Sequence, residues 1–295
     1  MTFELQDVGF AYHSKNTIRR RVFSSLTLSV QRGECVGVLG HEGAGKTTLL
    51  QCMAGLLRPD GGSIDIDGVN IWQGDHFTAQ LRRQIGFAFQ FPEQQFFCDT
   101  IEEELLYARN NFRDYVGTVC MAPHEALNAL GLDADPFLHR SPFSLSMGEA
   151  RRVALATLLM TKPNALLLDE PTVGLDGAGT DIVVNLLSRM KHEGVTVVVV
   201  SHDVDVLAEV ASRIIIMENG RVLEDGAVQN IFVNDLLLST YGYGVPEIVR
   251  IMRGEAADHG WTIVPPPRVR WAVSSRATKR SPRNTSSGLS RVIWQ

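Results

Sequence analysis

Three patterns in the sequence predict an α/β protein with a parallel-sheet core, a β-region before it, an inserted helical block and a small C-terminal appendage. In the first forty residues, apolar and polar residues alternate with period two at 3–8 and 26–30, which predicts half-buried strands. Residues from about 100 to 160 have helical periodicity instead. Continuous apolar runs typical of buried parallel strands lie at 35–39, 165–168, 196–200 and 213–217.

The remaining elements follow from turn residues and periodicity. The turn at 60–62 precedes a short strand at 63–68, and another strand is predicted at 85–89. Helices are predicted at 101–109, 123–130, 149–160, 230–238 and 246–253. We therefore expect a domain over 1–227 with a helical subdomain at about 91–162, a helical extension over 228–262, and a basic Ser/Arg-rich disordered tail over 263–295.

Composition narrows the class of protein. The chain has 295 residues, 44% of them hydrophobic and 21% charged, which is ordinary for a soluble globular protein. A net charge of −5 argues against a general nucleic-acid binder. No apolar run approaches the roughly 20 residues of a membrane span, and no signal peptide is expected at the N-terminus. The four cysteines lack C-x-x-C spacing, which predicts reduced, mostly buried thiols.

Residues 40–47 read Gly-His-Glu-Gly-Ala-Gly-Lys-Thr, the G-x-x-x-x-G-K-[ST] pattern of a loop that cradles nucleotide phosphates. An apolar strand precedes the loop and a helix follows it, so backbone N–H groups and the positive helix end would face the anion. The sequence therefore predicts a P-loop NTPase (RecA-like) core that binds ATP or GTP. The predicted nucleotide-binding residues are Gly40, Gly43, Gly45, Lys46, Thr47 and Thr48.

Polar side chains follow three further strands. Asp169 and Glu170 end one of them: Asp169 would hold Mg²⁺ together with Thr47, and Glu170 would orient the water that attacks the γ-phosphate. Gln90 would sense Mg²⁺ or that water, and His202 would hydrogen-bond the γ-phosphate. Each feature alone is also compatible with a solvated turn or a surface side chain. Their chain order carries the prediction of ATP hydrolysis.

The sequence Leu145-Ser146-Met147-Gly148-Glu149 opens the last helix of the inserted block. Its helix N-terminus is a second candidate anion site. The same residues could also form an ordinary helix cap, with Ser146 as the N-cap residue and Glu149 as the acidic residue of a capping box. Both interpretations can hold at once.

Taken in order, these motifs and the later Gly174-Leu175-Asp176 resemble those of the ATP-binding cassette ATPases over residues 3–227. The resemblance implies that Tyr12 stacks on adenine, although it could be a plain strand tyrosine. It also implies that two ATPase subunits close around ATP. The family's signature motif, which matches residues 145–149 here, and the Gly-Leu-Asp loop of one subunit would then contact the nucleotide bound to the other subunit. In this chain the implied residues are Ser146, Gly148, Glu149 and Asp176.

Residues 89–97, Phe-Gln-Phe-Pro-Glu-Gln-Gln-Phe-Phe, and Ser-Pro-Phe-Ser-Leu-Ser at 141–146 resemble the energy-coupling factor transporter ATPases. The stretch 241–247 resembles part of that group's C-terminal extension. The resemblance implies a peripheral protein on the cytoplasmic face of a bacterial membrane. Its expected partners are a second ATPase subunit, a transmembrane coupling subunit and a substrate-binding membrane subunit, with no nucleic acid. ATP and Mg²⁺ are the expected cofactors, and a vitamin or a transition-metal ion is the expected cargo.

Two departures keep alternatives open: Met147 stands in place of the usual first signature Gly, and Glu149 in place of the usual Gln. These departures leave open a regulatory ATP-binding subunit with weak hydrolysis. Another importer or an exporter is a separate alternative, because only the stretch at 89–95 and the C-terminal tail distinguish these transporter classes. A DNA-repair cassette ATPase is disfavoured, because only about a hundred residues separate Lys46 from Ser146.

Overall fold

The computed structural model describes residues 1–12, 20–113, 120–252, 271–272 and 293–294. The N-terminal β-region is a four-stranded antiparallel sheet in the order β2-β1-β4-β5. Phe3 and Leu5 of its central strand are buried while Glu4 is exposed, as the alternating sequence requires. The strands are β1 (Phe3–Tyr12), β2 (Arg20–Val30), β4 (Gly61–Ile66) and β5 (Val69–Asn70).

The second sheet has six strands in the order β10-β9-β3-β8-β7-β6. Its strands pair in parallel except β10, which pairs antiparallel with β9 at one edge. Every residue of β3, β7 and β8 is buried, which explains their continuous apolar sequences. The strands are β3 (Cys35–Gly40), β6 (Ile85–Ala88), β7 (Ala165–Asp169), β8 (Thr196–Val200), β9 (Arg213–Glu218) and β10 (Arg221–Ala227).

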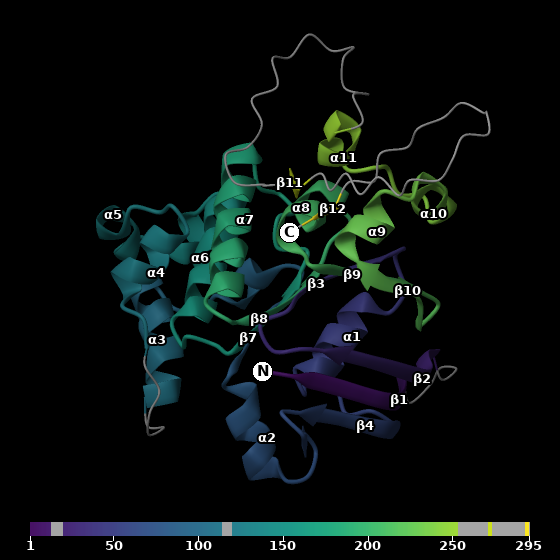
Figure 1. Ribbon diagram of the computed structural model, residues 1–295. Helices are drawn as coiled ribbons and strands as arrows, with labels where there is room; N and C mark the ends of the chain where they lie inside the picture. The colour runs from purple at the N-terminus through teal and green to yellow at the C-terminus, as the bar shows by residue number, and fades with distance from the viewer. Residues whose placement is uncertain (13–19, 114–119, 253–270, 273–292, 295) are drawn as a thin grey trace, which may run out of the picture.

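Side chains on alternate positions of the six-stranded sheet join two different cores. Val198 and Val200 pack with α1 (Lys46–Met53) and the antiparallel sheet on one face. Val197 and Val199 face the opposite core. That second core is covered by helices α6 (Met147–Leu159), α7 (Gly177–His192), α8 (Val204–Val210) and α9 (Val228–Phe232). The six-stranded sheet is therefore covered on both faces (Figure 1).

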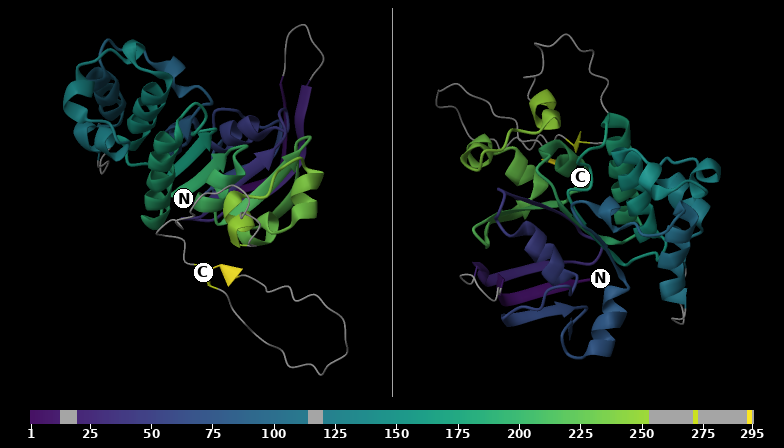
Figure 2. Two further views of the ribbon diagram at one scale, coloured as in Figure 1. Left: turned by 90° about the horizontal axis from the view of Figure 1, so that it is seen from above. Right: turned by 180° about the vertical axis from the view of Figure 1, so that it is seen from behind.

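The helical block lies beside the β6 edge of the sheet, away from the antiparallel sheet in each view (Figures 1 and 2). Besides α6 it contains α3 (Ile101–Arg113), α4 (Pro123–Ala129), α5 (Ala134–Leu138) and the short 3₁₀ turns η1 (Pro92–Gln95) and η2 (Pro142–Ser144). Helices α3 and α4 of this block pack on α6, and α5 packs on α3 and α4. Ser146 is the N-cap residue of α6. Three helices outside this block were given no residue range from the sequence: α2 (Asp75–Arg82), α7 and α8.

The C-terminal extension continues the main core. Phe232, Leu238 and Val249 are buried in the same cluster as β8 and α7. Besides α9, its helices are α10 (Asp235–Thr240) and α11 (Glu247–Met252). The predicted disordered tail lies outside the described residues, apart from β11 (Trp271–Ala272) and β12 (Ile293–Trp294), which pair with each other.

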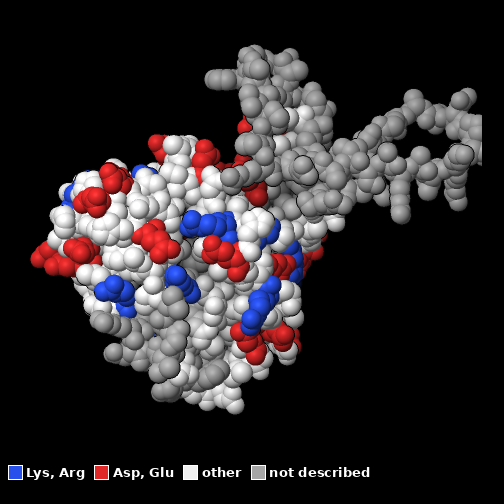
Figure 3. Space-filling model, turned by 60° about the vertical axis from the view of Figure 1, so that its left-hand side comes forward, with Lys and Arg blue, Asp and Glu red and all other residues white. Residues whose placement is uncertain are grey.

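Within the described part of the chain, no helix is long and apolar enough to cross a membrane. On the face drawn in Figure 3, acidic and basic side chains are interspersed among neutral ones.

Candidate active site

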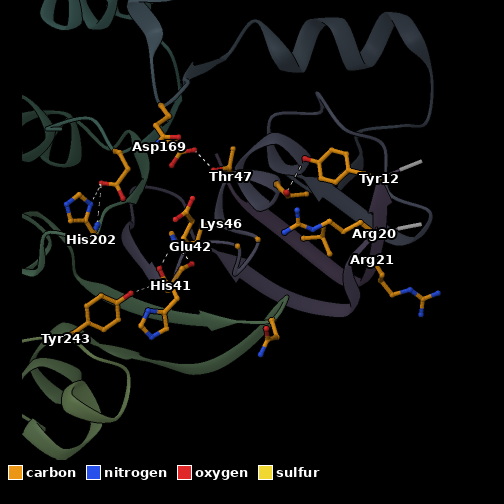
Figure 4. A pocket seen from close by; sticks show the side chains of 18 residues that line it. Tyr12, Arg20, Arg21, His41, Glu42, Lys46, Thr47, Asp169, His202 and Tyr243 are labelled. Atoms are coloured by element: carbon orange, nitrogen blue, oxygen red, sulfur yellow. Dashed lines mark hydrogen bonds and ion pairs between the residues drawn. The ribbon is translucent and has the colours of Figure 1, made fainter. Parts of the chain in front are cut away.

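A cavity of about 890 Å³ opens at the carboxyl ends of β3, β7 and β8, where α/β sheets commonly bind ligands (Figure 4). Eleven predicted site residues line it: Tyr12, Gly40, Gly43, Gly45, Lys46, Thr47, Thr48, Gln90, Asp169, Glu170 and His202. Seven further lining residues were not predicted: Arg20, Arg21, Val22, His41, Glu42, Asn219 and Tyr243. The fold thus brings together motifs that lie far apart in the sequence.

The phosphate loop has the backbone that its glycines predict. Gly43 and Gly45 have φ values of 80° and 100°, which favour glycine. A Cβ atom at Gly40 would lie 2.4 Å from the Met217 carbonyl oxygen, so the first glycine is required by close approach. Helix α1 has no acidic residue in its first turn, which leaves its positive end available to an anion.

Lys46 folds back over the loop: its Nζ donates hydrogen bonds to the carbonyl oxygens of Gly40 and His41. Burial lowers the pKa of this amine, and the carboxylates of Glu170 and Asp169 act in the opposite direction. A cation that is hydrogen-bonded to backbone carbonyl groups in a partly buried cavity is well suited to exchange these partners for phosphate oxygens.

The Thr47 hydroxyl donates a 2.6 Å hydrogen bond to Asp169 Oδ2 at the end of β7. Burial raises the pKa of Asp169, while this hydrogen bond counteracts the shift. No cluster of three or more His, Cys, Asp or Glu side chains able to hold a metal occurs among the described residues. Mg²⁺ commonly uses one or two protein oxygens plus substrate phosphates, so the Thr47–Asp169 pair fits Mg²⁺ bound together with ATP.

Glu170 adopts a left-handed backbone conformation, with φ of 52°. For a residue other than glycine this costs about 1 kcal/mol or more, so neighbouring contacts must hold it. Its N–H donates to the Val200 carbonyl at 2.8 Å. Its side-chain Oε2 lies 3.0 Å from His202 Nδ1. The strained turn directs the carboxylate into the cavity beside the histidine.

Arg151 on α6 is 1% exposed and joins three of the predicted motifs. Its guanidinium donates to the carbonyl oxygens of Gln90 at 2.7 Å, of Glu170 at 3.0 Å and of Val173. It also pairs with Glu93 at 3.7 Å. We did not predict this role. The only sequence signal was a pair of adjacent arginines in an otherwise apolar helix.

At the other end of the cavity, Tyr12 is 44% exposed. Its hydroxyl lies 3.2 Å from Thr48 Oγ1, and its ring packs edge-on against Phe10 with centroids 5.0 Å apart. This leaves aromatic surface open beside the phosphate loop. In Figure 4, Arg20 reaches toward the cavity while Arg21 points away from it.

The signature residues do not line this cavity. At the start of α6, Ser146 accepts a hydrogen bond from Glu149 N, and Glu149 Oε2 accepts one from Ser146 N at 2.8 Å, which forms the predicted capping box. That backbone hydrogen bond lowers the pKa of Glu149. Gly148 adjoins the loop at Gly174, and Asp176 caps α7 by accepting from Gly179 N at 2.8 Å. Ser146, Gly148, Glu149 and Asp176 therefore form a second set of predicted site residues, which lies outside the cavity.

Comparison with known proteins agrees with this geometry. A family model described as ABC transporter matches residues 23–173. The energy-coupling factor transporter ATP-binding protein EcfA2 of Clostridium perfringens is 33% identical over 264 residues, covering 89% of this chain and 92% of the relative. The protein of the same name from Thermotoga maritima is 37% identical over 229 residues, covering 77% and 83% respectively.

Two solved structures have the same fold. The ATP-binding cassette MJ0796, in a dimeric post-hydrolysis state bound to ADP and Pi, matches with a TM-score of 0.68 at 29% identity, covering 77% of this chain and 98% of that one. The cbiO1 protein from Clostridium perfringens, part of the ABC transporter complex cbiONQ, matches with a TM-score of 0.66 at 27% identity, covering 85% and 98%.

The chain belongs to the ABC transporter family and is one of its ATPases. Within that family it belongs with the energy-coupling factor transporter ATP-binding proteins. The predicted fold class and family resemblance are confirmed.

Proposed function

We propose that this chain binds ATP with Mg²⁺ in the cavity and hydrolyses it at a head-to-tail interface with a second ATPase subunit. The chain would thereby drive a membrane importer for a vitamin or a transition-metal ion. The single observation that carries the proposal is the convergence of Lys46, Thr47, Asp169, Glu170 and His202 on one cavity. Mg²⁺ held by Thr47 and Asp169 would neutralise charge on the β- and γ-phosphate oxygens.

The hydrolytic step follows from the geometry around Glu170. Its carboxylate orients a water molecule toward the γ-phosphate, while its contact with His202 keeps both side chains turned toward the cavity. Lys46 leaves the carbonyl oxygens of Gly40 and His41 and pairs with the phosphates. Arg151 donates hydrogen bonds to the carbonyl oxygens of both Gln90 and Glu170. The loop that carries Gln90 and the turn that carries Glu170 are therefore held by the same side chain.

The second set of predicted site residues, at the start of α6 and α7, would complete the ATP site of the partner subunit. Ser146 and Gly148 lie at the start of α6, where helix N–H groups can face a phosphate of the opposing subunit's ATP. Met147 is 63% exposed beside them, at a position where the partner would meet it. Two ATP molecules would then hold the dimer closed, and hydrolysis would release it.

A surface near Gln90 suits a membrane partner. Phe97 and Tyr107 are 59% and 50% exposed, and their rings pack edge-on with centroids 4.7 Å apart. Large exposed aromatic side chains are typical of protein interfaces. A membrane subunit bound there would contact the loop that carries Gln90, on the cytoplasmic side of the membrane.

The test is ATP turnover by the purified chain, alone and assembled with its candidate partner ATPase and membrane subunits. We expect turnover to rise on assembly. Glu170→Gln should lower it by roughly 10²- to 10⁴-fold while ATP still binds, because only the proton-accepting group is lost. Glu193→Gln, in an exposed pair with Arg189, is the matched control and should leave turnover unchanged.

If the assembled complex keeps its turnover with Glu170→Gln, the partner performs the chemistry and this chain is a regulatory ATP-binding subunit. The exposed Met147 in the signature would then be the feature that distinguishes it. If the wild-type chain binds no ATP in any assembly, the proposed function is wrong.

A further inference from the structure

One residue of the cavity comes from the C-terminal extension. The Gly40 N–H donates a 2.7 Å hydrogen bond to the Tyr243 hydroxyl, across 203 residues of sequence. The Tyr243 ring also stacks on His41, with centroids 6.1 Å apart and an angle of 13° between the ring planes. Figure 4 shows the tyrosine reaching the phosphate loop from the side opposite Tyr12.

Backbone contacts within the extension position this tyrosine. Its backbone N–H donates to the Leu238 carbonyl at 2.8 Å, and Leu238 is fully buried. Gly242 has a φ of 72°, and a Cβ atom there would lie 3.3 Å from His41 Cε1. The turn therefore fits closely against the phosphate loop.

The same segment makes a second contact beside the cavity. Glu247 N, at the start of α11, donates to Asp205 Oδ1. Asp205 lies three residues after His202, in the first turn of α8. Residues 242–247 therefore contact both the phosphate loop and the segment that carries His202.

Lys46 and Tyr243 hold the same two residues from different sides. Lys46 binds the Gly40 and His41 carbonyl oxygens, whereas Tyr243 binds the Gly40 N–H and the His41 ring. In the proposed function, Lys46 leaves those carbonyl groups when ATP binds. Tyr243 then remains to keep the start of the loop in its binding conformation.

We propose that Tyr243 is a positioning residue that pre-organises the phosphate loop and couples the C-terminal extension to ATP binding. The inference rests on the proposed ATP site. Because binding linkage is reciprocal, an extension that favours ATP binding must itself be stabilised by ATP. A partner that grips the extension would accordingly change ATP affinity.

The test compares Tyr243→Phe with the wild-type chain. The variant loses the hydroxyl and keeps the ring that stacks on His41. Losing a neutral hydrogen bond typically costs about 1 kcal/mol, so ATP should bind roughly three- to tenfold more weakly. Turnover at saturating ATP should stay within about twofold, because Tyr243 acts on binding. Tyr241→Phe, two residues earlier and outside the cavity, is the matched control.

Hydrogen exchange gives a readout that a purely structural role would not change. In the wild type, a non-hydrolysable ATP analogue should slow amide exchange both at residues 40–47 and at residues 235–252. In Tyr243→Phe, saturating analogue should still protect 40–47 while the protection of 235–252 is lost. Equal melting temperatures of the two proteins without nucleotide would exclude a general folding defect.

The outcomes separate the two proposals. If the wild type fails to bind ATP, the proposed function falls and this inference falls with it. If the wild type binds ATP but Tyr243→Phe retains the same affinity and the same protection of 235–252, only the coupling role of Tyr243 is wrong.

Discussion

At the scale of single residues, Glu149 has two effects that oppose each other. Its carboxylate closes the capping box and pairs with Arg140 at 3.2 Å, so it stabilises the start of α6. In the proposed dimer the same negative charge would lie near the partner's triphosphate, which disfavours closure. Folding stability and nucleotide-dependent association therefore place opposite demands on this residue.

We expect Glu149→Gln to lower the free energy of unfolding by roughly 0.5–1 kcal/mol at neutral pH, since an amide accepts the Ser146 hydrogen bond without the charge. The folded-state pKa of Glu149 lies below its ordinary value. Its stabilising effect is thus complete above the unfolded pKa of about 4.3 and is lost as the pH falls through the folded pKa. Denaturant titrations at several pH values check this.

The same variant should associate more tightly with the partner ATPase in the presence of ATP, as measured by sedimentation. Ser141→Ala, which changes a nearby residue outside the capping box, serves as a control. Weaker association in Glu149→Gln would contradict the proposed position of this carboxylate beside a phosphate.

At the scale of elements, α6 is joined to the loops after β6 and β7 through Arg151. One buried guanidinium binds the carbonyl groups of Gln90, Glu170 and Val173, so the helical block and the catalytic turn are mechanically linked. This contact also explains how Glu170 keeps its left-handed backbone.

Arg151→Met should destabilise the chain by roughly 3–5 kcal/mol, because it leaves Glu93 and buried carbonyl groups without their cation. Arg151→Lys should destabilise less, yet lower turnover more than ATP affinity, because an ammonium group cannot hold three carbonyl groups in the same fork. Urea unfolding and steady-state kinetics measure both effects.

Arg189→Met is the matched control. The Arg189 side chain is 47% exposed and pairs with Glu193 one helical turn away, so the change should stay within about 0.5 kcal/mol. Comparable losses in the two methionine variants would mean that Arg151 contributes no more than a surface arginine does.

At the scale of the whole molecule, the two cores on either face of the sheet protect different thiols. Cys35 lies in one core and Cys52 in the other, and burial raises the pKa of each to about 12. Cys98 and Cys120 are partly exposed.

Burial and the nearby carboxylate of Glu104 raise the pKa of Cys98, so this thiol should react more slowly than its exposure alone would suggest. In the native chain at mildly alkaline pH, a thiol reagent should therefore label Cys120 first and Cys98 next, while Cys35 and Cys52 react only through unfolding. Mass spectrometry of labelled peptides over time shows which thiols have reacted, and full denaturation should expose all four thiols. Rapid native labelling of Cys35 would show that the core around β3 opens far more easily than its burial implies.

Much of the fold and of the cavity could be predicted because the signals are local. Each of three motifs lies within fewer than ten consecutive residues: the phosphate loop, the apolar strand before Asp169 and the capping box of Ser146. Parallel strands then bring their carboxyl ends to one edge of the sheet, which unites these motifs. Helix α2 was not predicted because it is short, with eight residues, and five of them are polar.

The sequence by itself determined the residue types that contact phosphate and the hydrophobic pattern that buries the sheet. Only the tertiary structure decided which side chains support them. Arg151 reaches Gln90 across 61 residues, and Tyr243 reaches Gly40 across 203. Neither contact can be recognised from a periodic pattern in the sequence. The buried Arg151 and the partly buried Tyr243 find their hydrogen-bond partners through packing in three dimensions, and no sequence spacing encodes that packing.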